Sequence, residues 1–369
     1  MRPKSVAIIG TRGIPNRYGG FEQFAEYLSV ALAAKGHDVT VYNPSHHEYQ
    51  SCSYSGVTIT HKWCPEAYLG AAAHIIYDYV CLRDAIRQNV DVVIELGYQS
   101  SALSMLLLHV GGVRIITNMD GLEWKRDKWS WLVKRFTKWA EKTAVLKSDQ
   151  LISDNIGIQE YIKEEYGRQS TMIPYGAEIP SIIDETLIDK YKVSARSYFL
   201  AIARLEPENN IEMVLDGYVA SSQSIPFLVV GNASTKYGAM LRKKYSRANI
   251  QFAGGVYDKS ILDSLRFYTN AYFHGHSVGG TNPSLLEAMA SRSLIVAHSN
   301  VFNRSVLGSD AHYFSSKSDV HQVILSLEDS GEAAAIEEGF KENNLRKIEE
   351  VFSWERVISQ YEDLIRGVE

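Results

Sequence analysis

The stretch that decides the fold is FHGHSVGGTNPSLLEAMA, residues 273–290. It starts at the end of an apolar strand, Ala271–His274, passes through a Gly-Gly loop, and continues as an apolar helix over Pro283–Ser291. Asn282 is a good N-cap and Pro283 suits the first helical position, so the helix is expected directly after the loop. A strand, a glycine-rich turn and a helix in this order predict one unit of an α/β fold with a parallel sheet.

The same alternation extends outward from this stretch over almost the whole chain. The expected strands are Val6–Gly10, Val39–Asn43, Val57–Thr60, Val92–Glu95, Arg114–Asn118, Gln150–Ser153, Tyr198–Ala203, Phe227–Gly231, Ile250–Ala253, Ala271–His274 and Leu294–His298. The expected helices are Phe21–Lys35, Gly70–Gln88, Ser101–Val110, Lys128–Lys147, Gly157–Tyr166, Ile211–Ser221, Lys236–Ser246, Ser260–Tyr268 and Pro283–Ser291. Short apolar strands between helices favour parallel sheets that are covered on both faces.

The pattern restarts after a polar stretch in the middle of the chain, which predicts two doubly wound, Rossmann-like domains. We place them at residues 1–178 and 179–352. Ser353–Ile365 reads as an amphipathic helix, and we expect residues 353–369 to pack near the N-terminal domain. Ligands of such sheets bind beyond the carboxyl ends of the strands, and two facing sheets would form a cleft.

Composition excludes several classes of protein. The 369 residues are 45% hydrophobic and 22% charged, as in ordinary globular proteins, and the net charge of −5 argues against a nucleic-acid-binding chain. The three cysteines, Cys52, Cys64 and Cys81, fit neither a redox pair nor a zinc knuckle, so we expect buried structural thiols in a reduced cytoplasmic protein. No stretch is apolar enough to span a bilayer, and a cleaved signal peptide is not expected.

The loop after the first strand, GTRGIPNRYGGFE at residues 10–22, is a candidate phosphate-binding element. It matches neither a dinucleotide fingerprint nor a Walker A loop. A helix starts at Gly19-Gly20, where free backbone N–H groups favour phosphate, and Arg12 and Arg17 add positive charge. The alternative is a tight turn in which the glycines only permit close packing.

Two loops of the second half carry the same kind of signal. The backbone around Gly279–Asn282 suits a diphosphate, and Glu287 in the apolar helix requires a partner, which a ribose diol would supply. Alternatively, Glu287 reaches solvent. Arg204 ends the strand at Tyr198–Ala203, where it would either neutralise phosphate or form a surface ion pair with an acidic neighbour.

A third region, DGLEWKRDKWSW at residues 120–131, follows a strand of the first half. Asp120 and Glu123 are candidates for a base or for binding hydroxyl groups, with helix capping as the alternative. Residues 122–147 contain eight Lys or Arg against three acids, interleaved with tryptophan and phenylalanine. This composition suits an anionic membrane surface, or else a packed amphipathic helix with a solvated basic face.

Together these pieces resemble a GT-B glycosyltransferase of the large retaining family four, over essentially the whole chain. The segments GTRGIP-x-x-YGGFE and DGLEWKR are similar to a bacterial subgroup of rhamnosyltransferases in capsule and cell-wall polysaccharide assembly. The resemblance implies that Arg204 binds the donor diphosphate, that Glu287 binds the nucleotide ribose, and that the segment ending at Tyr257 lines the base.

The chain departs from the family pattern at two positions. The first glutamate of the family's Glu-x7-Glu pair is Gly279, and the lysine of its Arg-Leu-x-x-x-Lys motif is Asn209. The donor sugar contacts are therefore not carried over, and Arg12 or Arg17 would replace the lost lysine. The implied catalytic residues are Arg204, Asp120 and Glu287. The implied donor-binding residues are Arg12, Gly19, Gly20, Arg204, Asn209, Tyr257, His276, Gly279, Gly280, Thr281, Asn282 and Glu287. The implied acceptor-side residues are Asp120, Glu123 and Trp124.

The sequence therefore predicts a retaining hexosyltransferase without a cofactor or metal. Its expected reaction moves L-rhamnose from dTDP-rhamnose to a lipid-linked saccharide, with another donor such as a UDP-hexose as the alternative. It would be cytoplasmic and peripheral on the inner face of the plasma membrane, docked through residues 122–147. Two rivals remain on the same architecture: a nucleotide-sugar 2-epimerase, and a nucleotide-sugar-binding assembly subunit without catalysis.

Overall fold

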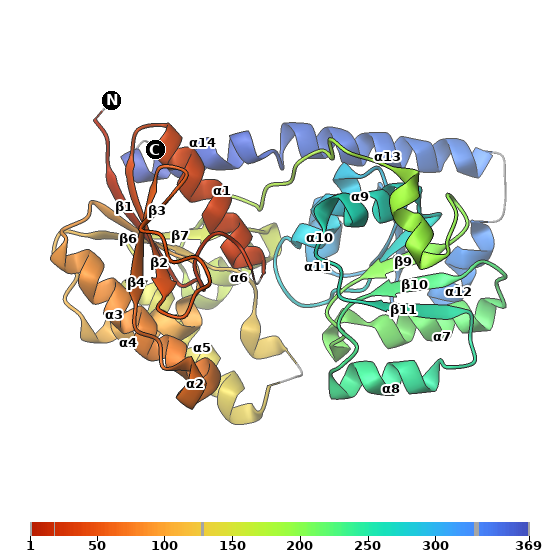
Figure 1. Ribbon diagram of the computed structural model, residues 1–369, viewed down its shortest axis with the longest axis horizontal. Coiled ribbons are helices and arrows are strands. Elements are labelled where there is room, and N and C mark those ends of the chain that lie inside the picture. Colours follow the sequence, from red (N-terminus) through yellow and green to blue (C-terminus); the bar gives the residue numbers. More distant parts are fainter. Residues whose placement is uncertain (1, 18, 127–128, 328–331, 368–369) are drawn as a thin grey trace. The chain divides into compact units, whose positions relative to one another are not determined.

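The computed structural model describes residues 2–17, 19–126, 129–327 and 332–367 (Figure 1). The chain forms two compact units. The first contains Met1–Trp124, Trp129–Tyr175 and Trp354–Glu369, and the second contains Lys125–Lys128 and Gly176–Ser353. We expected the boundary between the two domains after residue 178, and in the structure the first unit gives way to the second after Tyr175.

The first unit is built on an eight-stranded sheet in the order β3-β4-β2-β1-β5-β6-β7-β8. Its strands are β1 (Ser5–Ile9), β2 (Asp38–Pro44), β3 (Ser53–Tyr54), β4 (Val57–Lys62), β5 (Val92–Glu95), β6 (Arg114–Asn118), β7 (Gln150–Ser153) and β8 (Thr171–Met172). All neighbours pair in parallel except β3 and β4. The apolar β5 is buried along its whole length, as a strand covered on both faces must be.

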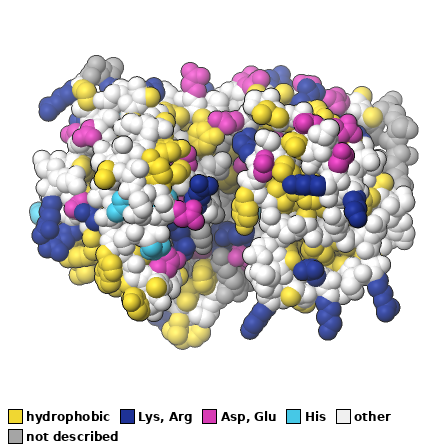
Figure 2. All heavy atoms as spheres, in the orientation of Figure 1, with side chains coloured by type: hydrophobic (Ala, Val, Ile, Leu, Met, Phe, Trp, Pro, Cys, Tyr) yellow, Lys and Arg dark blue, Asp and Glu magenta, His cyan; other side chains and the backbone are white. Residues whose placement is uncertain are grey.

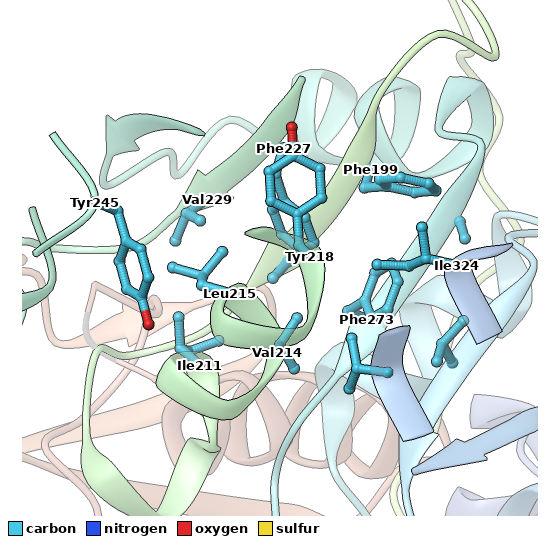
Figure 3. Close-up of a cluster of buried hydrophobic side chains, with 14 of the residues drawn as sticks. Phe199, Ile211, Val214, Leu215, Tyr218, Phe227, Val229, Tyr245, Phe273 and Ile324 are labelled. Atoms are coloured by element: carbon cyan, nitrogen blue, oxygen red, sulfur yellow. The ribbon is translucent and has the colours of Figure 1, made fainter. Parts of the chain in front are cut away.

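The second unit contains a six-stranded, all-parallel sheet in the order β11-β10-β9-β12-β13-β14. Its strands are β9 (Phe199–Ile202), β10 (Phe227–Val230), β11 (Ile250–Gly254), β12 (Ala271–His274), β13 (Ile295–His298) and β14 (His312–Phe314). Its core is a continuous cluster in which Tyr218 and three phenylalanines lie in contact (Figure 3). The phenylalanines are Phe199, Phe227 and Phe273, one from each of the strands β9, β10 and β12.

Helices connect the strands of each unit (Figure 1). Those of the first unit are α1 (Gly20–Ala34), α2 (Glu66–Leu69), α3 (Ala73–Arg87), α4 (Tyr98–Leu107), α5 (Trp131–Lys147), α6 (Ile156–Tyr166) and α14 (Trp354–Arg366). Those of the second are α7 (Ile211–Ser221), α8 (Lys236–Lys244), α9 (Lys259–Tyr268), α10 (Pro283–Ala290), α11 (Val301–Leu307), α12 (Lys317–Ser326) and α13 (Glu332–Glu350). Short 3-10 turns are Gly70–Ala72, Glu123–Lys125, Glu185–Tyr191 and Pro207–Asn209.

Every strand and helix expected from the sequence is present, with ends shifted by a few residues. Helix α5 begins at Trp131, and Lys128, where we expected its start, lies outside the described residues. The sequence analysis did not predict β3, β8, β14 or the helices α2 and α11–α13. Strands of two or three residues carry too little pattern to be recognised, and the long helix α13 lacks a clear apolar stripe.

The C-terminal helix α14 packs within the first unit. Phe24 of α1 contacts Trp354 and Tyr361 of α14, with ring centroids 5.7 Å and 5.2 Å apart, and Lys35 Nζ lies 2.6 Å from a Glu362 oxygen. These contacts explain why the last helix groups with the first sheet although it follows the second in sequence.

Two further expectations are answered by the structure. Cys64 and Cys81 are buried free thiols, but Cys52 is exposed, so the expectation of buried thiols was wrong for Cys52. Within the described residues, no helix has the length and hydropathy needed to cross a bilayer.

The contact between α7 and α12 gives a test of packing. A Cβ added to Gly217 of α7 would lie 2.5 Å from Val320 Cβ and 2.6 Å from the Lys317 carbonyl oxygen, whereas one on Gly339 of α13 would meet nothing. Gly217→Ala is therefore expected to destabilise the protein by about 1–3 kcal/mol through overpacking. Gly339→Ala is expected to stabilise it by about 0.5–1 kcal/mol through helix propensity. Chemical denaturation measures both, and equal effects would contradict the packing argument.

Candidate functional site

The candidate site of the second unit lies at the switch point of its sheet. Strand β9 has β10 on one side and β12 on the other, so the chain crosses the sheet in opposite directions from this point. The loops that follow β9 and β12 leave from neighbouring strand ends, where open α/β sheets bind ligands. Arg204 and Asn209 lie on the first loop, and Gly275–Asn282 form the second.

These two loops are joined by hydrogen bonds to backbone carbonyl groups. Asn210 Nδ2 donates to the Gly275 carbonyl at 2.8 Å, and the amide and hydroxyl of Ser277 donate to the Glu208 carbonyl at 3.1 Å and 2.8 Å. A Cβ on Gly275 would lie 2.1 Å from the Asn209 carbonyl oxygen, so only glycine permits this approach. The two loops therefore form one platform.

Arg204 stands exposed on this platform. Among the described residues its guanidinium has no hydrogen-bond or ion-pair partner, and the surface ion pair considered as the alternative, with Glu206 or Glu208, is not formed. A guanidinium has five N–H donors in a planar fork that matches phosphate oxygens. The structure thus presents Arg204 with its full donor set available to an anion.

His276 is the nearest titratable neighbour of Arg204 on the second loop. Burial lowers the pKa of His276 to about 3, and the charge of Arg204 adds to this shift. The ring stacks on His274 at a centroid distance of 4.4 Å, and burial also places the pKa of His274 well below its usual value. Both imidazoles are therefore neutral near pH 7, and the positive charge that acts on His276 comes from Arg204 and Arg126.

The glycine loop offers backbone donors, but the helix after it does not. The Asn282 side chain caps α10 by accepting from Ser284 N at 2.9 Å, and Leu285 N donates to the Asn282 carbonyl, as the N-cap prediction requires. The expectation that the first N–H groups of this helix are exposed to a diphosphate was wrong, because the cap uses them. The amides of Gly279 and Gly280 have no acceptor among the described residues, and Thr281 lies buried beside them.

Glu287 has a protein partner that the sequence analysis did not foresee. Arg266 of α9 is 2% exposed, and its guanidinium donates to Glu287 Oε2 at 2.5 Å and to Asp263 at 3.3 Å. The Glu287 side chain is 24% exposed, so it is neither a solvated carboxylate nor one that needs a ribose to be satisfied. A ribose would meet a carboxylate that Arg266 already holds in place.

Two other predicted donor residues differ in their surroundings. Asn209 is buried, and its amide donates to the Arg204 carbonyl at 2.7 Å, so this group holds the backbone of the loop. That Asn209 also contacts the donor stays a prediction. Tyr257 follows β11 and is 88% exposed, at the same edge of the sheet as Arg204.

In the first unit, the loop after β1 is bound by acidic side chains. Glu22 and Glu26 of α1 accept from the amides of Arg12 and Asn16 at 2.9 Å and 2.7 Å. Gly19 N donates to Asn16 Oδ1, and α1 begins at Gly20 with Gly19 as its N-cap. We expected the amides at Gly19-Gly20 to be available to phosphate, but the amide of Gly19 is bound by the Asn16 side chain.

The two arginines of that loop are paired in the structure. Arg12 Nη1 lies 3.0 Å from Glu66 Oε1, and Arg17 lies 3.7 Å from Glu48 with both side chains largely exposed. The Arg17 pair is weak because solvent screens it. Neither guanidinium is free within this unit to replace the missing lysine.

The predicted acceptor-side residues lie on the segment between β6 and α5. Trp124 Nε1 donates to Glu141 Oε2 at 3.1 Å, and Trp129 Nε1 donates to Glu123 Oε2 at 3.2 Å. Glu141 is 1% exposed and also accepts from the hydroxyls of Tyr161 and Tyr166, each at 2.6 Å. This buried carboxylate anchors the segment that carries Asp120.

Helix α5 has an exposed face that is aromatic and basic. Its exposed apolar residues are Trp131, Leu132, Phe136, Trp139 and Leu146, and Leu103, Leu106 and Leu107 of α4 are also exposed. Figure 2 shows hydrophobic side chains gathered at the end of the first unit where α2 lies. Lys138 does not belong to a solvated basic face: it lies 4.8 Å from the Trp124 and Tyr161 ring centroids and pairs with Glu141.

Comparisons with known proteins support the fold but assign no activity. Residues 3–178, just under half of the chain, match a family described as a domain of unknown function, DUF1972. No curated protein matches the chain significantly.

Solved structures match over the full length. Sucrose-phosphate synthase from Thermosynechococcus elongatus is 15% identical, with 99% of each chain covered and a TM-score of 0.79. HepE from Anabaena in complex with UDP-glucose is 12% identical, with 99% of this chain and 100% of HepE covered and a TM-score of 0.76. An α,α-trehalose 6-phosphate synthase from Burkholderia multivorans is 12% identical, with 100% of this chain and 99% of that chain covered and a TM-score of 0.74. The protein has the GT-B fold of these glycosyltransferases.

The pair between Glu287 and Arg266 leads to a stability prediction. Glu287→Ala would leave a buried guanidinium with one carboxylate fewer, so we expect a loss of about 2 kcal/mol in the free energy of unfolding. Glu342→Ala removes a carboxylate from Arg292, a pair that is largely exposed, and should cost less than about 0.5 kcal/mol. Urea denaturation of both variants measures the difference, and equal losses would remove the structural role of Glu287.

Proposed function

We propose that the protein is a retaining glycosyltransferase that moves a hexosyl group from a nucleotide donor. The observation that carries the proposal is Arg204, an exposed guanidinium on a platform that also bears the amides of Gly279 and Gly280. Neither the guanidinium nor these amides have a partner among the described residues. Arg204 lies at the switch point of a parallel sheet, and the chain has the GT-B fold; both support the proposal of a glycosyltransferase. Among its neighbours in fold, HepE has been solved with UDP-glucose.

In this proposal the enzyme acts mainly on the departing diphosphate. The contacts between the two loops fix the backbone that carries Arg204 and the amides of the glycine loop, and these donors would stabilise the developing negative charge. Neutral His276 adds no charge of its own, and the positive charge that acts on it comes from Arg204 and Arg126.

Attack from the face that the diphosphate leaves requires no protein nucleophile. The acceptor hydroxyl would attack the anomeric carbon while the bond to the phosphate oxygen breaks, and that oxygen would take the hydroxyl proton. Glu287 would orient the nucleotide ribose, and Asp120 and Glu123 would contact the acceptor. We propose that transfer needs no metal; activity that is lost in EDTA and restored by Mg²⁺ or Mn²⁺ would contradict this.

For the donor we propose dTDP-L-rhamnose, with a UDP-hexose as the alternative. Gly279 stands where the resembling family has a carboxylate that binds sugar hydroxyls, which favours a donor with fewer hydroxyl groups. HepE with UDP-glucose is the observation that favours the alternative. A thermal-shift panel of dTDP, UDP, GDP and their sugars separates the two, because a ligand of the folded state raises stability with its affinity.

For the acceptor we propose a saccharide on a lipid diphosphate, met at an anionic membrane on the cytoplasmic side. The exposed aromatic residues of α5 have the amphipathic character of membrane-interface residues, and Lys134, Arg135 and Lys142 supply the charge. Since Lys138 is held inside the unit, it is not part of this surface.

Arg204→Ala is expected to lower kcat/KM at least about 100-fold, as removal of a charge-stabilising donor does. Stability should be unchanged, since the side chain is exposed and has no partner among the described residues. Arg247→Ala, in the turn between α8 and β11, is a matched surface control. Steady-state kinetics with the donor identified by the panel provide the measurement. Near-normal turnover of Arg204→Ala would remove the diphosphate assignment.

Trp131→Ser with Leu132→Ser should release the protein from anionic vesicles, because both side chains are 63% exposed on α5. The control is Val301→Ser, an exposed apolar residue of α11 in the second unit. Sedimentation with phosphatidylglycerol vesicles and transfer to long-lipid and short soluble acceptors are measured for each. Unchanged sedimentation of the double variant would exclude this docking surface.

The rival readings predict other outcomes. An epimerase would isomerise the donor without an acceptor. An assembly subunit would bind the donor in the thermal-shift panel yet show no turnover with any saccharide acceptor.

A further inference from the structure

A cluster of metal-ligating side chains lies in the first unit. Cys64, Glu66 and His74 each offer a ligand atom, and these atoms all lie within 4.8 Å of one another. Cys64 follows β4, Glu66 begins α2, and His74 lies in the first turn of α3. The sequence analysis found no such site, because the three residues come from three different elements.

One group of this cluster, the His74 imidazole, is not satisfied by the protein alone. Its Nε2 atom is buried and has no hydrogen-bond partner among the described residues, and it lies 3.8 Å from Glu66 Oε1. An imidazole nitrogen buried without a partner is costly, and a metal ion would satisfy it. Cys64 is 7% exposed, so its sulfur is also screened from bulk water.

We propose that Cys64, Glu66 and His74 bind one Zn²⁺ ion. A thiolate, an imidazole and a carboxylate are the ligand types that zinc takes, whereas Mg²⁺ and Ca²⁺ prefer oxygen ligands alone. Three protein ligands leave one position of the tetrahedron for water.

The charges around the cluster are compatible with a divalent cation. The Cys64 thiolate and the Glu66 carboxylate together balance the charge of Zn²⁺, and binding transfers the thiol proton to solvent.

Arg12 and His46 also contact Glu66. Arg12 Nη1 lies 3.0 Å from Oε1, and His46 Nε2 lies 3.1 Å from Oε2. A carboxylate has about four acceptor sites, so these contacts leave room for a metal bond. Through Glu66, the proposed site is linked to Arg12 on the loop after β1 and to His46 on the loop after β2.

The experiment uses the full-length protein after removal of metal. Titration with ZnCl₂ is followed by calorimetry, and titration with CoCl₂ is followed by the absorption band of a cobalt-thiolate bond. We expect one Zn²⁺ per chain and the thiolate band. Cys64→Ser and His74→Gln should each weaken Zn²⁺ binding at least about 100-fold, since even partners outside the ligand set change affinity 10- to 100-fold.

Matched controls use residues of the same type. Cys52→Ser removes an exposed thiol, and His46→Gln removes an imidazole that contacts Glu66 but lies outside the three ligands. Cys52→Ser should bind Zn²⁺ like the unmodified protein, and His46→Gln should lose far less affinity than His74→Gln. A missing cobalt-thiolate band in the unmodified protein, or equal losses in the ligand and control variants, would overturn the site. Because these readouts measure metal binding, they stand apart from the success or failure of the proposed sugar transfer.

Discussion

The candidate donor site depends on the close approach of two loops at the switch point of the second sheet. The backbone of Gly275 lies against the Asn209 carbonyl, and Asn210 and Ser277 bind across the gap. A parallel sheet buries its strands on both faces, so polar groups can gather only where the strands end. The platform fixes the backbone that carries Arg204, and its exposed guanidinium, which has no partner in the described part of the chain, is available to an anion.

Buried charged groups hold the surroundings of the candidate residues in each unit. In the second unit, the guanidinium of Arg266 on α9 pairs with Glu287 on α10. In the first, Glu141 accepts from Trp124 and from two tyrosines, and so anchors the segment that carries Asp120. Such pairs are costly to break, because the remaining charge would stay buried without its partner. They act as positioning groups, and a substitution there changes stability as well as activity.

The first unit uses its charged residues differently from what the sequence suggests. Arg12 and Arg17 flank a glycine-rich turn, which favours phosphate, but the fold supplies carboxylates to the arginines and to the amides of the turn. The same loop brings Arg12 to Glu66, beside Cys64 and His74. Four residues therefore lie close together at the proposed zinc site: Arg12, Cys64, Glu66 and His74.

The sequence by itself determined the α/β class and the two mainly parallel sheets, because hydrophobic periodicity is a local property of the chain. It also determined the start of α10, because Asn282 and Pro283 act within the first turn of that helix. It also placed Arg204 at a strand end. Only the tertiary structure decided the partners of two charged groups: Arg266 for Glu287, and Glu66 for Arg12. It alone brought together Cys64, Glu66 and His74. The physical reason is that a local pattern determines which segments form helices and strands, whereas these ion pairs and ligand sets depend on which helices and loops become neighbours in the fold.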